Sequence, residues 1–135
     1  MLAPSEGLAM LGRSAKMKPD IEKKYLLKPE DFKQLISPIG SCYASDQILV
    51  DGKKVGYMIR EEPSDTVSSG WTFMSGDESQ EYAGDPTKWA IYDVNTICNY
   101  DPSIIQYLDS KIGTAYGRDL GADGFQEEPL HPNTK

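Results

Sequence analysis

The 135-residue chain contains few of the residues that most often carry metal or nucleophilic chemistry. It has one histidine, His131, and two cysteines, Cys42 and Cys98, which form no CxxC pair. These three residues are too few and too far apart in sequence to form the Cys and His ligand set of a structural zinc site, so we expect no metal site. Ser75 has no histidine near it in sequence, which argues against a catalytic triad. Neither GxGxxG nor GxxxxGK[ST] occurs, so no nucleotide cofactor is expected.

Long apolar runs are also missing. None approaches the roughly 18 residues that cross a bilayer. The short apolar patch Gly7–Leu11 follows an acid, Glu6, where a secretion signal would carry bases. We therefore expect a cytoplasmic chain whose cysteines stay reduced. Residues 1–24 show no sustained hydrophobic period and are predicted to form a flexible N-terminal tail, in which Met1 and Met17 are both candidate starts.

Basic residues are scarce in the second half of the chain. Ten of the 14 Lys and Arg residues precede residue 61, whereas 14 of the 21 Asp and Glu residues follow residue 60, and the net charge is −7. An acidic surface repels phosphate and anionic lipid, so neither nucleic acid nor a membrane is an expected partner. A basic protein is therefore the favoured class of partner. The alternative is that the charge only keeps the domain soluble.

The composition is that of an ordinary globular domain, with 39% hydrophobic and 26% charged residues. A chain of this length buries enough surface to fold without disulfide or metal cross-links. We predict one α+β domain over residues 25–120, built on a mostly antiparallel sheet with two or three short helices. Residues 121–135 are rich in Gly, Asp, Glu and Pro and are predicted to form a C-terminal tail.

Two segments carry helix signals. A proline and two acids open residues 29–36, where apolar residues then recur at helical spacing. Asp101-Pro102 supplies an N-cap and a first-turn proline for a second helix over residues 102–109. Asp85-Pro86 repeats this pair and predicts at most a turn or two of helix.

Asp51-Gly52 is the strongest hairpin signal, because both residues tolerate the positive φ of a tight turn. It predicts that Gln47–Val50 and Val55–Arg60 run antiparallel. In the second of these strands Val55, Tyr57 and Ile59 alternate with other residues and are expected to face the core. Further strands are predicted at Trp71–Met74, Trp89–Tyr92 and Gly113–Arg118.

Three carboxylates crowd one predicted turn: Asp77, Glu78 and Glu81, with Tyr82 directly after them. Such a cluster could bind a hard cation or act as an acid–base pair. However, the EF-hand spacing is absent, and paired catalysis requires two well-separated pKa values. The alternative is a solvated acidic loop.

Other candidates lie near predicted strand ends. Arg60 and Glu61 end the predicted hairpin strand, where an exposed ion pair would add little stability. Asn95, Asn99 and Asp101 either satisfy backbone donors or form a partner-binding edge. Trp71 opens an apolar strand and is expected to be mainly a core residue.

Three blocks of sequence together resemble one bacterial family. The blocks are Ser45-Asp46 with Val50–Pro63; Ser69–Trp71 with Ser75–Glu78 and Tyr82; and Ile91–Pro102. In combination, over roughly residues 40–118, they are similar to the immunity protein 33 family, long described as a domain of unknown function. The resemblance implies a small α+β protein, and gene neighbourhoods assign some members as immunity proteins of polymorphic toxin systems. It implies no catalytic residues.

We therefore predict a non-enzymatic interaction protein that binds and neutralises a bacterial toxin, without a cofactor. The alternative is a small ligand-binding or hydrolytic domain that uses the acidic cluster at 77–81. The residues expected to contact a partner are Arg60, Glu61, Trp71, Asp77, Glu78, Glu81, Tyr82, Asn95, Asn99 and Asp101.

Overall fold

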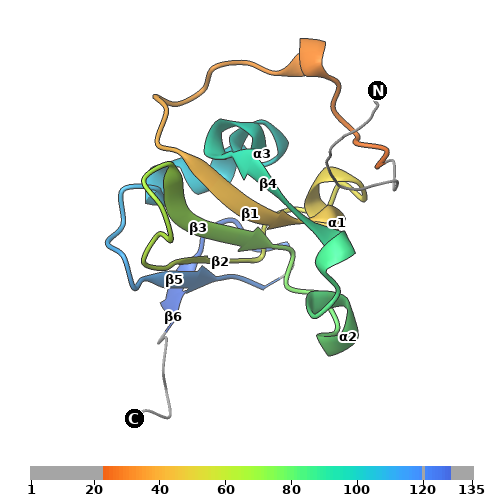
Figure 1. Ribbon diagram of the computed structural model, residues 1–135. Helices are drawn as coiled ribbons and strands as arrows, with labels where there is room; N and C mark the ends of the chain where they lie inside the picture. The colour runs from red at the N-terminus through yellow and green to blue at the C-terminus, as the bar shows by residue number, and fades with distance from the viewer. Residues whose placement is uncertain (1–22, 120, 129–135) are drawn as a thin grey trace.

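A mixed six-stranded sheet forms the frame of the molecule in the computed structural model, which describes residues 23–119 and 121–128 (Figure 1). The strand order is β4-β1-β3-β2-β5-β6. The strands are β1 (Ser41–Ser45), β2 (Tyr57–Arg60), β3 (Ser68–Met74), β4 (Trp89–Asp93), β5 (Ala115–Gly117) and β6 (Gln126–Glu128). Only β1 and β3 pair in parallel; the other neighbouring pairs are antiparallel. The predicted α+β class with a mostly antiparallel sheet is confirmed.

Short helices connect the strands. The α-helices are α1 (Asp46–Leu49), α2 (Gln80–Ala83) and α3 (Val94–Tyr100), and the 3₁₀ helices are η1 (Pro29–Asp31), η2 (Pro86–Lys88) and η3 (Pro102–Tyr107). Both Asp-Pro pairs open a helix as predicted. The Asp85 side chain accepts a hydrogen bond from the Thr87 amide, and the Asp101 side chain accepts one from the Ser103 amide.

The core lies between one face of the sheet and the helices α1, α3 and η3. Trp71 and Phe73 of β3 stack there, with ring centroids 5.7 Å apart. Ile97 of α3 and Ile104 of η3 are fully buried in the same cluster. Trp71 is only 1% exposed, which confirms its predicted place in the core.

The predicted hairpin at Asp51-Gly52 is wrong. Residues 46–49 form α1, because the Ser45 hydroxyl accepts a hydrogen bond from the Gln47 amide and caps a helix start. Gly52 does take a positive φ of 80°, but it ends a helix and does not join two strands. β2 pairs instead with β3 and β5.

The predicted inward row of β2 is wrong as well. Met58 is fully buried, whereas Tyr57 and Ile59 point to the other face and are partly exposed. Val55 is buried but precedes the strand, so its burial does not set the phase of the strand. Side chains alternate along a strand, and a shift of one residue exchanges the two faces.

Three further elements differ from prediction: η1, α3 and β6. The helix predicted over residues 29–36 shortens to η1, and residues 33–36 have no regular structure and are hydrogen-bonded to α3. α3 itself is not predicted above, although Val94, Ile97 and Cys98 have helical spacing and are all buried. Residues 125–128 of the predicted C-terminal tail add the buried Phe125 and strand β6. The predictions for residues 1–22 and 129–135 fall outside the described residues.

Candidate functional site

The acidic turn follows β3 and is organised by one of its own carboxylates. Glu78 folds back so that its two oxygens accept hydrogen bonds from the amides of Ser75 (2.9 Å) and Gly76 (3.0 Å). Gly76 has a φ of +94°, which a residue with a side chain adopts only with strain. The Ser75 hydroxyl donates to the side-chain oxygen of Gln47 and accepts from the Asp77 amide. The turn is therefore held by its own polar groups.

This hydrogen bonding fixes the charge of Glu78. Burial by itself raises the pKa of the Glu78 carboxyl, but hydrogen bonds from the Ser45 side chain and from the Ser75 and Gly76 amides outweigh that effect and lower the pKa below its ordinary value. Glu78 is therefore ionised near neutral pH. A carboxylate in this state is a poor general acid.

The other two acids of the cluster point to solvent. Asp77 is exposed and forms a surface ion pair with Lys53, with 3.2 Å between nitrogen and oxygen. Glu81 is exposed on α2. Tyr82, half-buried beside it, lies under the Lys88 ammonium at 5.8 Å from its ring centroid. Asp77 and Glu81 are thus free to meet a partner, whereas Glu78 has a structural role.

Two adjoining open grooves lie beside the turn. The first, of about 650 Å³, is lined in part by Lys53, Asp77 and Ser103. The second, of about 540 Å³, is lined in part by Met74, Glu78 and Glu128. They meet at Gly56, where a Cβ atom would lie 2.0 Å from the Ser75 carbonyl oxygen. Glu81 lines neither groove, so the three acids do not converge on one point.

A nearly buried ion pair forms the wall of the first groove. Arg118 donates to Asp101 over 2.7 Å, and the two side chains are 9% and 4% exposed. The second Asp101 oxygen accepts from the Ser103 hydroxyl at 2.6 Å, and Arg118 also donates to the Val55 carbonyl oxygen at 2.9 Å. The guanidinium stacks 4.1 Å from the centroid of the Phe125 ring. This network joins β5, η3 and the segment before β2.

Asp101 and Trp71 are both buried, so neither lies on a surface that a partner could contact in this structure. Asp101 is 3% exposed, and its oxygens are occupied by Arg118, Ser103 and the Val55 amide. Trp71 donates its indole N–H to the Leu108 carbonyl oxygen inside the core. A partner cannot reach either side chain without opening the fold.

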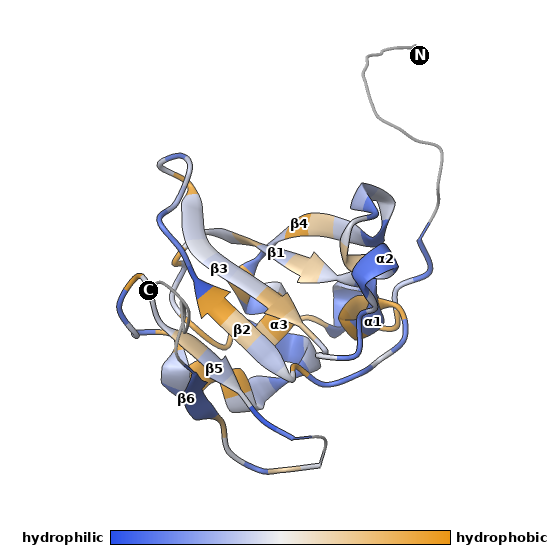
Figure 2. Cartoon of the chain, turned by 90° about the horizontal axis from the view of Figure 1, so that it is seen from below, coloured by the Kyte–Doolittle hydropathy of each residue, from blue (hydrophilic) through white to orange (hydrophobic). Residues whose placement is uncertain are grey.

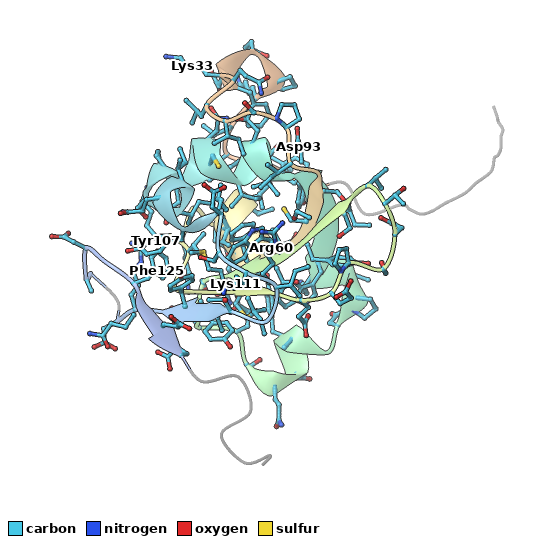
Figure 3. The ribbon with its side chains drawn as sticks, turned by 90° about the vertical axis from the view of Figure 1, so that its left-hand side faces the viewer. Lys33, Arg60, Asp93, Tyr107, Lys111 and Phe125 are labelled. Carbon is cyan, nitrogen blue, oxygen red and sulfur yellow. The ribbon has the colours of Figure 1, made fainter. Side chains whose placement is uncertain are left out.

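Arg60 also points inward, near the centre of the molecule in Figure 3. Its guanidinium donates to the carbonyl oxygens of Ser69 (2.9 Å) and Ser110 (2.8 Å) and lies 5.8 Å from the Trp71 ring centroid. No described carboxylate pairs with Arg60, so the ion pair considered for Arg60 and Glu61 does not form among the described residues. Glu61 is exposed.

The side chains of Asn95 and Asn99 bind backbone groups of residues 33 and 35. The Asn95 side chain accepts from the Leu35 amide (2.8 Å) and donates to the Lys33 carbonyl oxygen (2.8 Å). Asn99 accepts from the Lys33 amide (3.0 Å) and donates to the same carbonyl oxygen (2.9 Å). One turn of α3 separates the two side chains, so both lie on the same face of the helix and bind the backbone of residues 33–36. Of the two alternatives considered for these residues, the structure shows the one in which the side chains bond to backbone groups.

Arg118 is the main residue that the sequence analysis missed. No residue next to it in sequence reveals its role, because Asp101 lies 17 residues away and Phe125 comes from the far side of a loop. Figure 3 shows Phe125 beside Tyr107, whose hydroxyl accepts from the Phe125 amide at 3.1 Å. Only the fold brings these groups together.

Two features are missing from the described residues. Among these residues, no group of three or more His, Cys, Asp and Glu residues could hold a metal ion. The helices in this part of the chain are all too short or too polar to cross a membrane.

Comparison with known proteins gives one match. The model of the immunity protein Imm33 domain family matches residues 42–127, which is more than half of the chain. No curated protein and no solved structure matches the chain. The matched region includes all six strands except the ends of β1 and β6, together with the acidic turn and the Asp101–Arg118 ion pair. The chain therefore belongs to the immunity protein Imm33 domain family.

Proposed function

We propose that this protein is a cytoplasmic immunity protein that binds a bacterial toxin domain and neutralises it by direct contact. Membership of the immunity protein family over residues 42–127 is the observation that carries the proposal. The exposed acids Asp77 and Glu81 support it, because they lie in the half of the chain with 14 acids and four bases. Such a surface attracts a basic protein surface.

The geometry supports the hydrolytic alternative less well. Asp77 lines one groove, Glu78 lines the other, and Glu81 lines neither. Glu78 is also committed to two backbone amides of its own turn. Acid–base chemistry would need two carboxylates with separated pKa values on the same substrate. A contact surface makes no such demand.

The test is the rate at which the purified protein associates with the toxin domain encoded beside its gene, measured at low and high salt. The double substitution Asp77→Lys/Glu81→Lys should slow association and weaken its salt dependence, because exposed charges act mainly on the association rate. Glu78 is left unchanged because its carboxylate holds the turn.

Glu30→Lys/Asp109→Lys is the matched control, since it reverses two exposed acids on other elements and changes the net charge equally. It should slow association less than the first variant. Equal slowing by both would show that net charge alone steers binding. If the wild-type protein binds no such toxin and does not protect cells that express it, the proposed function is wrong.

A further inference from the structure

One face of the sheet carries no helix among the described residues. The buried strand residues Ala44, Met58, Trp71 and Phe73 all point to the side of α1, α3 and η3. Their neighbours in sequence therefore point to the opposite face. β4 forms one edge of the sheet and lies beside β1 (Figure 2). We call the side away from the helices the outer face.

Four side chains form a continuous row across the outer face. Tyr43 of β1 is in register with Ile91 of β4 on one side and with Thr72 of β3 on the other, and Thr72 is in register with Ile59 of β2. Residues in register lie about 5 Å apart and share a face. Ile91 is 61% exposed and Tyr43 is 53% exposed. We call these four residues the outer row.

The charges around the outer row are mostly acidic, with exposed Lys88 directly before β4 as the exception. The six strands contain a single basic residue, Arg60, and its side chain is turned into the core. Asp93 ends β4 and is exposed, as are Glu61 directly after β2 and Glu128 on β6. Burial raises the pKa of Tyr57, and the carboxylates of Glu128 and Glu61 raise it further, which places both acids near this outward-facing residue.

We infer that the outer row is the surface that docks the toxin domain, and that the toxin's matching surface is apolar at its centre and basic around it. This inference rests on the proposed function. A central apolar contact with charges at its rim is the usual anatomy of a protein interface. A second copy of this chain would bring acids against acids, so the charge pattern favours a basic partner over self-association.

The test uses the full chain and the toxin domain encoded beside its gene. Hydroxyl-radical footprinting of the complex should protect Tyr43 and Ile91 several-fold relative to the free protein. Tyr25 is the internal control: it is 42% exposed and packs against Tyr92, away from the outer row. Its oxidation should not change. This measurement requires no variant to fold.

Substitutions give the second measurement. Ile91→Lys and Tyr43→Lys should each raise the dissociation constant by about 30-fold or more, as for a charge placed at an interface hot spot. Leu26→Lys is the matched control, because Leu26 is 57% exposed and lies beside Gly52 and α1. It should change the dissociation constant by less than about threefold. Unfolding midpoints equal to that of the wild type would show that the variants are folded.

Each other outcome overturns the inference. If the wild-type protein binds the toxin while Tyr43 stays unprotected and both lysine variants bind normally, the toxin docks elsewhere and the proposed function stands. If the wild type does not bind, both proposals fail. A dimer of the free protein that Ile91→Lys separates would assign the outer row to a second copy. If Tyr43 is protected in the free chain and deletion of residues 1–22 removes this protection, the outer row is the docking site of that N-terminal segment.

Discussion

Asp101 and Arg118 are nearly removed from water, and each compensates the charge of the other. Asp101→Ala would leave the Arg118 guanidinium 9% exposed without its carboxylate. Loss of one partner of a buried pair costs about 3–5 kcal/mol, because the remaining charge is uncompensated. We expect urea unfolding to show a loss of this size.

Asp77→Ala is the comparison for Asp101→Ala. It removes an ion pair with Lys53 whose side chains are 55% and 44% exposed. Exposed pairs contribute about 0–1 kcal/mol, so this variant should unfold within about 1 kcal/mol of the wild type. Equal losses for the two variants would contradict the structural role given to Asp101.

Glu78 should make stability depend on pH. Its pKa is lower in the folded protein than the value of about 4.3 expected in the unfolded chain. The stabilising contribution is therefore complete above the unfolded pKa and is lost as the pH falls through the folded pKa. Glu78→Gln has one amide oxygen to offer two backbone donors and does not titrate.

Urea midpoints from pH 7 to pH 3 test this expectation. The wild type should exceed Glu78→Gln in stability at pH 7, and the difference should shrink below about pH 4. Glu81→Gln is the control, since the Glu81 carboxylate accepts no hydrogen bond within the described part of the chain. A difference for Glu78→Gln that stays constant over this range would contradict the role of the ionised carboxylate.

The sequence identified candidate residues such as Asp101 more easily than it predicted which groups their side chains contact. Asp101 stood out as a helix cap, and its cap bond to Ser103 is present. Its ion pair with Arg118 depends on β5 lying near the start of η3, which no local pattern encodes. Trp71 was placed in the core because it follows a glycine in an apolar strand, a local signal that tertiary packing reinforced.

At the scale of elements, Asn95 and Asn99 of α3 fix segment 33–36 by hydrogen bonds. Asn95→Ala/Asn99→Ala should release this segment, because the amides of Lys33 and Leu35 lose their acceptors. Each hydrogen bond is worth about 1 kcal/mol, so exchange of these amides should accelerate at least about fivefold. Hydrogen exchange followed by NMR measures both amides in one experiment.

The Lys28 amide is an internal control for this variant. It donates to Asp31 within η1 and makes no contact with either asparagine. Its exchange should stay unchanged. If Lys33 and Leu35 also keep their protection, packing of Ile36 and Ile39 against the core, and not the asparagines, holds the segment.

Strands were easier to predict than helices in this chain. β3 and β4 contain short aromatic and β-branched runs, which prefer the strand conformation. The helices α1 and α3 have four and seven residues, too few for propensity to outweigh packing. Ser45 decided between helix and hairpin at residues 46–49, because its side chain caps a helix start. The hairpin prediction rested on Asp51-Gly52 and took no account of this cap.

At the scale of the whole molecule, helices cover one face of the sheet, and the outer face carries no helix from residues 23–119 or 121–128. Antiparallel sheets commonly pack one face on the core and leave the other in water. The alternation along β1 and β4 could have indicated the outer face, since Tyr43 and Ile91 are large hydrophobic residues at outward positions. Their pairing depends on the register of two strands whose paired residues, Tyr43 and Ile91, lie 48 positions apart in sequence, and composition does not supply this register.

The two cysteines report on the opening of the whole fold. Cys42 of β1 and Cys98 of α3 lie in one core cluster at 2% and 0% exposure. Burial raises the pKa of both thiols, to about 11 for Cys98, and Asp93 raises both further. The thiolate is the reactive form, so neither cysteine should react with a thiol reagent in the native state at pH 8. In denaturant the reduced protein should give two reactive thiols.

The rate of labelling connects these thiols to global stability. If the thiols become accessible only by global unfolding, labelling of native protein should accelerate in Asp101→Ala by the factor that corresponds to its loss of stability, on the order of 100-fold or more for 3 kcal/mol. Tyr25→Cys, at a position 42% exposed, should add one thiol that reacts at once in the native protein. Fast labelling of Cys98 alone in the wild type would contradict this prediction and show that α3 separates from β1 without global unfolding.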